Sequence, residues 1–187
     1  MDGLRERKRA ASRAQTVDAA LALFAERGFD HVTVADICSR ADIAPRTFFR
    51  YFPSKDDVLV EPARDMGDRV AGFIAAAPPG LGDAEVLRLA LRQLGEYVLT
   101  QRARLETFLR VAAASAERAS PLVRLSDAER RLAEQLTQRR PQPSVPDWRT
   151  RLLVARAVAA HRIWLDDLVA GTEPDPLAHL DEVLAEL

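Results

Sequence analysis

The side chains best suited to do chemistry lie close together between residues 45 and 55. Arg46, Thr47, Phe49 and Arg50 place two guanidinium groups, a hydroxyl and an aromatic ring within five residues. Arginine binds guanine bidentately and also binds phosphate, so this set suits contacts with double-stranded DNA. The pattern leaves open which arginine contacts bases and which contacts phosphates.

The element that precedes this set is a short helix. Apolar residues recur at helical spacing between residues 34 and 41, which predicts one buried face. Thr33 and Asp36 have the spacing of a capping box, in which each residue binds the backbone N–H of the other. A break around Asp42 then separates this helix from the next one.

The second helix is the one that carries the candidate side chains. Pro45 suits its first turn, where the missing N–H is not needed, and Phe48 and Phe52 lie four residues apart on one face. A helix of two turns is unstable alone in water, so neighbouring elements must hold it with its basic face outward. A helix held in this way suits the major groove of DNA.

The whole pattern resembles the helix-turn-helix of TetR-type transcriptional repressors. The residues that carry the resemblance are Gly28-Phe29, Thr33-Val34, Ile37, Ala41 and the run from Thr47 to Lys55. One departure is Asp42, at a turn where the family usually has glycine. Asp tolerates left-handed backbone angles better than most residues, so we expect the turn to be kept.

The resemblance implies an all-α fold of about nine helices with two functional parts. Residues 1–53 are expected to form a DNA-binding domain, with the helix-turn-helix at about 33–52, and residues 54–187 a ligand-binding and dimerisation domain. The residues that it implies for DNA contact are Thr33, Ala44, Pro45, Arg46, Thr47, Phe49, Arg50, Tyr51 and Lys55. Among these, Tyr51 suits packing under the following helix equally well.

Charge is distributed unevenly along the 187 residues. The formal net charge is −1, but residues 1–55 contain ten Lys or Arg and seven Asp or Glu, which gives +3. The remaining residues contain seventeen and twenty-one, which gives −4. This asymmetry suits a protein that contacts DNA with one end.

Five cations gather in the first turns of the expected first helix, at Arg5, Arg7, Lys8, Arg9 and Arg13. Cations at this end of a helix oppose its dipole, so we expect the first turns to be frayed in the free protein. Two interpretations stay open: an arm that contacts the DNA backbone or minor groove, and a solvated run of charge.

Residues with the pattern of an enzyme or a metal site are missing from the sequence. The three histidines are scattered, and Cys38 is the only cysteine, so no zinc constellation has workable spacing. The sequence has neither a glycine-rich phosphate loop nor a nucleophile elbow. We therefore expect no catalytic residues, no metal and no cofactor.

The targeting features of the chain are equally sparse. Residues 1–9 lead into no apolar run, and no uncharged apolar stretch approaches the ~20 residues that span a bilayer. We expect no signal peptide and no membrane partner, and the single cysteine is consistent with a reducing cytoplasm.

Further helices are expected in the rest of the chain. Pro62 lies inside one of them and is expected to cause a kink or an early irregularity. Ser126 with Glu129 has the spacing of another capping box. The expected helices are residues 4–27, 55–77, 83–100, about 105–112, a helix ending near 140, 147–170 and about 177–187.

By the family resemblance, a small-molecule pocket lies in the larger domain. The mixture of apolar faces and a few arginines would suit an amphipathic anion such as an acyl-CoA. The aromatic, basic and imidazole side chains available to line the pocket are Tyr97, Phe108, Arg110, Trp148, His161, Arg162 and Trp164.

Surplus apolar surface on the last two helices predicts a dimer interface. Residues 147–170 are apolar on more than one side, so this helix must be buried in its own domain and against something further. In a homodimer it would form a four-helix bundle with its mate. The interface residues expected are Ala155, Ala159, Leu177, Leu180 and Leu184.

The expected function is a cytoplasmic, homodimeric bacterial repressor that a small molecule releases from a palindromic operator. Two alternatives from other classes are kept. One is a constitutive helix-turn-helix DNA-binding protein with no ligand. The other is a helical enzyme or interaction module in which the N-terminal motif is a coincidence.

Overall fold

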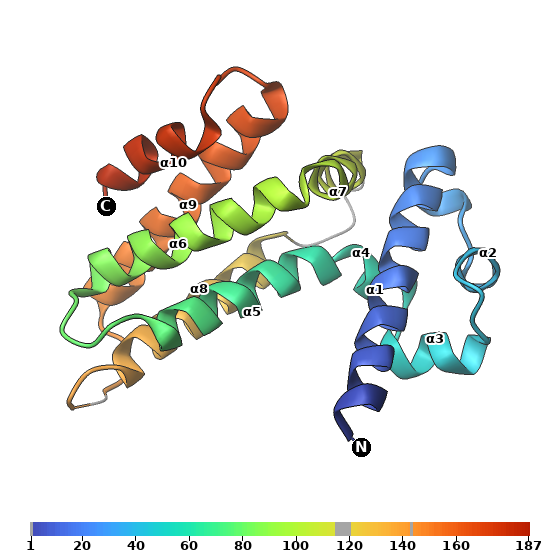
Figure 1. The fold of residues 1–187 in the computed structure, drawn as a ribbon, viewed down its shortest axis with the longest axis horizontal. Helices are drawn as coiled ribbons and strands as arrows, with labels where there is room; N and C mark the ends of the chain where they lie inside the picture. The colour runs from blue at the N-terminus through green and yellow to red at the C-terminus, as the bar shows by residue number, and fades with distance from the viewer. Residues whose placement is uncertain (1, 115–120, 143) are drawn as a thin grey trace. The chain divides into compact units, whose positions relative to one another are not determined.

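The computed structural model describes residues 2–114, 121–142 and 144–187, and every regular element in these ranges is helical (Figure 1). The all-α expectation is therefore confirmed. The elements are α1 Asp2–Arg27, η1 Phe29–His31, α2 Val34–Arg40, α3 Pro45–Tyr51, α4 Lys55–Leu59, α5 Glu61–Ala76, α6 Asp83–Thr100, α7 Arg102–Ala114, α8 Pro121–Gln138, α9 Trp148–Ala170 and α10 Pro176–Ala185.

The single helix expected from residues 55 to 77 is two helices. α4 ends at the C-cap Val60, and α5 begins at the next residue. Pro62 explains the position of the break, since it has no N–H to donate to the carbonyl of Val58, whereas proline is tolerated in the first turn of a new helix. The irregularity predicted at Pro62 is confirmed, and it accounts for one helix more than expected.

The turn of the helix-turn-helix keeps its shape without glycine. Asp42 has a φ of 51°, and the N–H of Ile43 donates to the carbonyl of Cys38 at 3.0 Å. The capping box predicted at Thr33 and Asp36 is also present, with both reciprocal hydrogen bonds. Local chemistry thus fixes where α2 begins and where the chain turns towards α3.

The described chain divides into two compact units. Unit 1 contains described residues 2–64 and 102–114, and unit 2 contains 65–101, 121–142 and 144–187. In unit 1, α1 packs against α2, η1, α4 and α7, and α2 packs against α3. The boundary predicted between residues 53 and 54 divides a DNA-binding domain from a ligand-binding and dimerisation domain, and it stays a prediction.

Unit 2 is a layered arrangement of helices in which α6 packs against α9 and α10 and α8 packs against α9 (Figure 1). Trp164 of α9 is fully buried, and its Nε1 donates to the carbonyl of Pro176 at 2.6 Å. Gly95 of α6 permits the close packing, because a Cβ there would overlap Leu180. The capping box predicted at Ser126 lies outside the side chains that the structure describes.

Candidate nucleic-acid interface

The two faces of α3 differ completely in exposure. Phe48 is 0% exposed and Phe52, its C-cap, is 1% exposed, so these two rings anchor the helix in unit 1. On the other face, Phe49 is 57% exposed, and both Arg46 and Arg50 are exposed. The structure therefore holds α3 as the sequence predicts, with its basic and aromatic face outward.

The start of α3 is also accessible. Ala44 is its N-cap, Pro45 is its first residue, and both are exposed, whereas Thr47 is half-buried. Ala44 provides no side-chain cap, and Pro45 has no N–H. The N–H of Thr47 donates to the carbonyl of Ala44 at 2.8 Å, so among the described residues the N–H of Arg46 is the one in the first turn that stays available. Free N–H groups at a helix start are suited to binding phosphate oxygens.

An arginine of the N-terminal charge run forms part of the support beneath α3. Arg13 of α1 stacks over the ring of Phe52, with its Cζ 4.8 Å from the ring centroid, and forms an ion pair with Glu61. This role was not predicted from sequence. The signal was available, because Arg13 lies four residues before the buried Val17 and so shares its helix face.

Lys55 has a structural role that the sequence did not reveal. Its ammonium donates to the carbonyl oxygens of Phe29 and Val32, both at 2.9 Å, and lies 4.4 Å from the centroid of the Phe29 ring. These contacts fasten the start of α4 to the segment between α1 and α2. An ammonium has three N–H donors, so one remains for the predicted DNA contact.

Thr33 is exposed, but its hydroxyl already serves the α2 cap. It accepts from the backbone N–H of Asp36 at 3.2 Å and donates to the Asp36 carboxylate at 2.5 Å. The bonds from Thr33 also hold the pKa of that carboxyl below its usual value. The remaining lone pair of the Thr33 hydroxyl can only accept, so Thr33 could donate to a DNA phosphate only by releasing Asp36.

Tyr51 is half-buried and ties the end of α3 to α1. Hydrogen bonds with Ser12 of α1 and with Arg50, together with the charges of Arg50 and Arg9, lower the pKa of the Tyr51 phenol. The Arg50 Nη2 lies 3.4 Å from the phenolic oxygen. The Tyr51 hydroxyl therefore lies in a positive environment.

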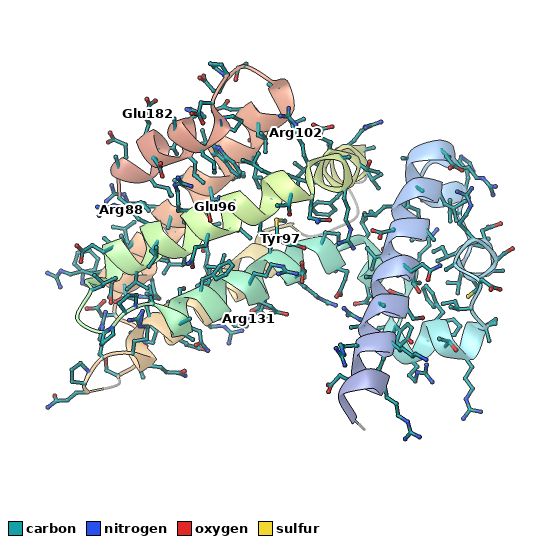
Figure 2. All side chains as sticks on the ribbon, viewed as in Figure 1. Arg88, Glu96, Tyr97, Arg102, Arg131 and Glu182 are labelled. Atoms are coloured by element: carbon teal, nitrogen blue, oxygen red, sulfur yellow. The ribbon has the colours of Figure 1, made fainter. Side chains whose placement is uncertain are left out.

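The seven residues predicted to line a ligand pocket are not brought together within either unit. Phe108 and Arg110 belong to unit 1, with Phe108 buried and Arg110 exposed, whereas the other five belong to unit 2. Within unit 2, Trp148 is 57% exposed and Arg162 is exposed. Tyr97 instead packs with neighbours on α5: the Arg69 guanidinium lies 3.7 Å from its ring centroid (Figure 2).

His161 and Trp164 are the two predicted residues that contact each other. Their rings stack with centroids 5.1 Å apart, and His161 is only 7% exposed. Neither ring nitrogen of His161 has a hydrogen-bond partner among the residues that the structure describes. Burial lowers the pKa of this imidazole from 6.5 to about 4, so it is neutral at pH 7.

The predicted dimer residues fall into two groups. Leu180 and Leu184 are 0% and 2% exposed within the single chain, because α10 turns them towards α6. They therefore belong to the core of unit 2 and are not available to a second chain. Ala155, Ala159 and Leu177 are only half-buried.

The outer face of α9 carries large exposed apolar side chains. Trp148, Leu152 and Ile163 are each at least 50% exposed, and with Ala155 and Ala159 they recur every three or four residues. This spacing places all five on one stripe of the helix. The predicted dimer interface included the two alanines but none of the three large residues. These three expose more apolar area than the alanines do.

The described part of the chain has no metal-binding cluster and no membrane-spanning helix. No group of three or more His, Cys, Asp or Glu side chains there is arranged to hold a metal ion. None of the helices there is both long enough and apolar enough to cross a membrane.

The chain is similar to known regulatory proteins. Residues 17–61 match the model of the tetR family of bacterial regulatory proteins. The HTH-type transcriptional regulator TcmR of Streptomyces glaucescens is 30% identical over 168 residues, covering 86% of this chain and 74% of TcmR. The HTH-type transcriptional repressor KstR of Rhodococcus jostii (strain RHA1) is 30% identical over 162 residues, covering 84% and 71%.

The fold is also similar to solved structures. A crystal structure of a protein from Syntrophomonas wolfei str. Goettingen superposes with a TM-score of 0.64, over 95% of this chain and 93% of that one. The two sequences are 19% identical, so this likeness concerns the fold alone.

Proposed function

The chain belongs to the tetR family of bacterial regulatory proteins, a family of transcription regulators and not of enzymes, and we propose that it is a cytoplasmic, homodimeric repressor that a small molecule releases from a palindromic operator. The observation that supports this most directly is the exposed basic and aromatic face of α3. Its buried Phe48 and Phe52 leave Arg46, Phe49 and Arg50 outward on one short helix.

A single α3 offers too few contacts for specific binding, so the proposal includes a dimer. Two copies related by a two-fold axis would read half-sites about 34–36 Å apart or slightly more. The proposed interface is the outer stripe of α9, where Trp148, Leu152 and Ile163 expose apolar area that a second copy would cover.

The dimer proposal is tested by a double variant, Leu152→Glu with Ile163→Glu. Both side chains are about half exposed in one chain, so the changes should leave the fold intact and give monomers in analytical ultracentrifugation. The matched control is Val169→Glu, a similarly exposed residue of α9 outside the stripe. A double variant that sediments as the wild type does would remove α9 from the interface.

The effector side of the proposal is supported by His161. A buried imidazole with two unpartnered nitrogens is costly, and a ligand with a hydroxyl or carbonyl group would satisfy it. Because this imidazole is neutral, it offers no charge to an acyl-CoA or other anion. An anionic ligand would need Arg162 or another exposed cation instead.

A thermal-shift screen of small molecules tests the effector proposal. A ligand at one hundred times its Kd should raise the free energy of unfolding by about 2.7 kcal/mol. The same ligand should weaken DNA binding, since it must prefer the state that binds DNA poorly. A screen that finds no stabilising compound would favour the constitutive alternative.

DNA binding itself is tested with a duplex selected from a random-sequence library by the wild-type protein. The protein should bind this duplex at least 10³-fold more tightly than random DNA of equal length. Arg46→Ala and Arg50→Ala should both weaken the binding. A selection that yields no preferred sequence would refute the proposed function.

A further inference from the structure

A shallow cleft in unit 1 lies between the first turns of α1 and the end of α3. It is lined by Arg5, Lys8, Arg9, Arg50 and Tyr51, and its volume is about 410 Å³. Four of the five lining residues are cations, and none is an acid. The N-terminal end of α1 and helix α3 can be followed in Figure 1.

The cations on α1 are placed there by helical spacing. Arg5 lies three residues before Lys8 and four before Arg9, and Ser12 follows these two at four and three residues, so the four share one face of the helix. Like charges at this spacing repel each other, and cations near a helix start also oppose its dipole. The cluster therefore costs stability in the free protein, and an anion in the cleft would remove that cost.

Arg50 is held at this cleft by its neighbour. Its Nη2 donates to the Tyr51 hydroxyl at 3.4 Å, and its Cζ lies 5.2 Å from the centroid of the Tyr51 ring. Ser12 and the charge of Arg9, both on α1, also lower the pKa of the Tyr51 phenol. The guanidinium of Arg50 lines the same cleft as the α1 cations, which makes one positively charged surface.

Arg46 lies one turn earlier on the same helix, and its surroundings differ. It is exposed and does not line the cleft, and no hydrogen bond or ion pair with another described residue restrains it. Bidentate recognition of guanine requires a guanidinium that can extend to a base edge. Arg46 meets this condition, whereas Arg50 would have to leave the cleft.

From this difference we infer that the cleft of Arg5, Lys8, Arg9, Arg50 and Tyr51 binds the DNA backbone through its phosphates, and that Arg46 reads a base. The inference rests on the proposed function and divides the work of its two arginines. It also resolves the two interpretations of the N-terminal charge run in favour of a backbone contact. Phosphate binding by such a group is independent of sequence and fixes the register of α3 in the groove.

The test measures affinity by fluorescence anisotropy across a series of KCl concentrations, for the selected duplex and for random DNA. Loss of one phosphate contact reduces the slope of log K against log salt by about 0.9. Arg50→Ala and Lys8→Ala should each reduce the slope in this way and weaken both DNAs by a similar factor. Arg46→Ala should change the slope by less than half of that amount. It should lower the ratio of the affinity for the selected duplex to that for random DNA by roughly 5- to 150-fold.

Conservative variants separate charge from geometry. Arg50→Lys should keep the wild-type slope, because a phosphate needs a cation, whereas Arg46→Lys should restore little of the specificity ratio. Arg7→Ala is the matched control on α1, since the Arg7 Nε donates to the carbonyl of Gly3 at 3.0 Å and Arg7 does not line the cleft. Circular dichroism of each variant verifies that the total helix content is retained.

Three results would overturn the inference. An Arg50→Ala protein that loses specificity with an unchanged slope would reverse the assignment of the two arginines. A slope change in Arg7→Ala equal to that in Lys8→Ala would assign the effect to the general charge of α1. Wild-type binding without sequence preference would refute the proposed function as well, so the two failures are distinguishable.

Discussion

Helices α3 and α9 differ in the face that each leaves exposed. α3 has seven residues, buries the ring of Phe48 and exposes two arginines and Phe49. α9 has twenty-three residues, buries the imidazole of His161 together with apolar side chains such as Trp164, and exposes an apolar stripe that includes Leu152 and Ile163.

The contrast teaches that the side chains exposed on a helix indicate the kind of molecule that the helix binds. An exposed basic and aromatic face fits a polyanion with flat bases, whereas an exposed apolar stripe fits another apolar surface. Buried faces are informative in the same way. Phe48 and Phe52 are satisfied by packing alone, whereas His161 is a polar group that packing cannot satisfy.

The largest expected effect is a difference in stability between variants of two adjacent phenylalanines, one on each face of α3. Phe48→Ala should lower the free energy of unfolding by about 3–5 kcal/mol, because it removes a ring that is 0% exposed. Phe49→Ala, at 57% exposure, should change it by no more than about 0.5 kcal/mol and should weaken DNA binding. Urea denaturation and anisotropy measure the two effects.

This pair is its own control, because both variants lose the same atoms one residue apart. Equal losses of stability would mean that Phe49 is also a core residue, and the division of α3 into two faces would be wrong. An unchanged DNA affinity in Phe49→Ala would leave the arginines as the functional side chains of that face.

The sequence predicts a feature well when the residues that produce it are close together in the chain. In unit 1 the cap at Thr33, the positive φ of Asp42 and the buried Phe48 depend on neighbours within a few residues. Spacing predicted the cap and the buried ring, and the family resemblance predicted the turn at Asp42. The bonds from Lys55 to Phe29 and Val32 span more than twenty residues, and no local pattern signals them.

Unit 2 was predicted well in its helices and poorly in its side-chain roles. Amphipathic periodicity gave α6 and α9 close to their observed bounds. It could not decide which of several apolar faces of α9 and α10 lies inward, so Leu180 was placed at an interface although it packs in the core. Which side of such a helix is covered depends on tertiary contacts that periodicity does not encode.

The second prediction tests the buried face of α9 through pH. The pKa of His161 is about 4 in the folded protein and 6.5 as the ordinary value, so between these pH values the unfolded state binds a proton that the folded state does not. The free energy of unfolding should therefore keep its full value above pH 6.5 and fall by about 3 kcal/mol as the pH falls to 4.

The measurement compares the wild type with His161→Leu in urea denaturation at pH 7, 6, 5 and 4. Carboxyl groups titrate in both proteins and cancel in the difference, which should grow by about 3 kcal/mol towards acid. At pH 7 the variant should be at least as stable, since it buries no unpartnered nitrogen. Parallel pH curves would show that His161 has access to water or a partner.

The smallest expected effect concerns the turn that orients α3. Asp42 has a φ of 51°, a conformation that costs an ordinary L-residue about 1–2 kcal/mol and glycine almost nothing. Asp42→Ala should therefore lower the free energy of unfolding by about 1 kcal/mol, whereas Asp42→Gly should leave it equal or slightly higher. The same urea titration measures both. Because the strain lies in the backbone of unit 1 and His161 lies in unit 2, a single urea transition that shifts both with Asp42→Ala and with pH would mean that the two units unfold together.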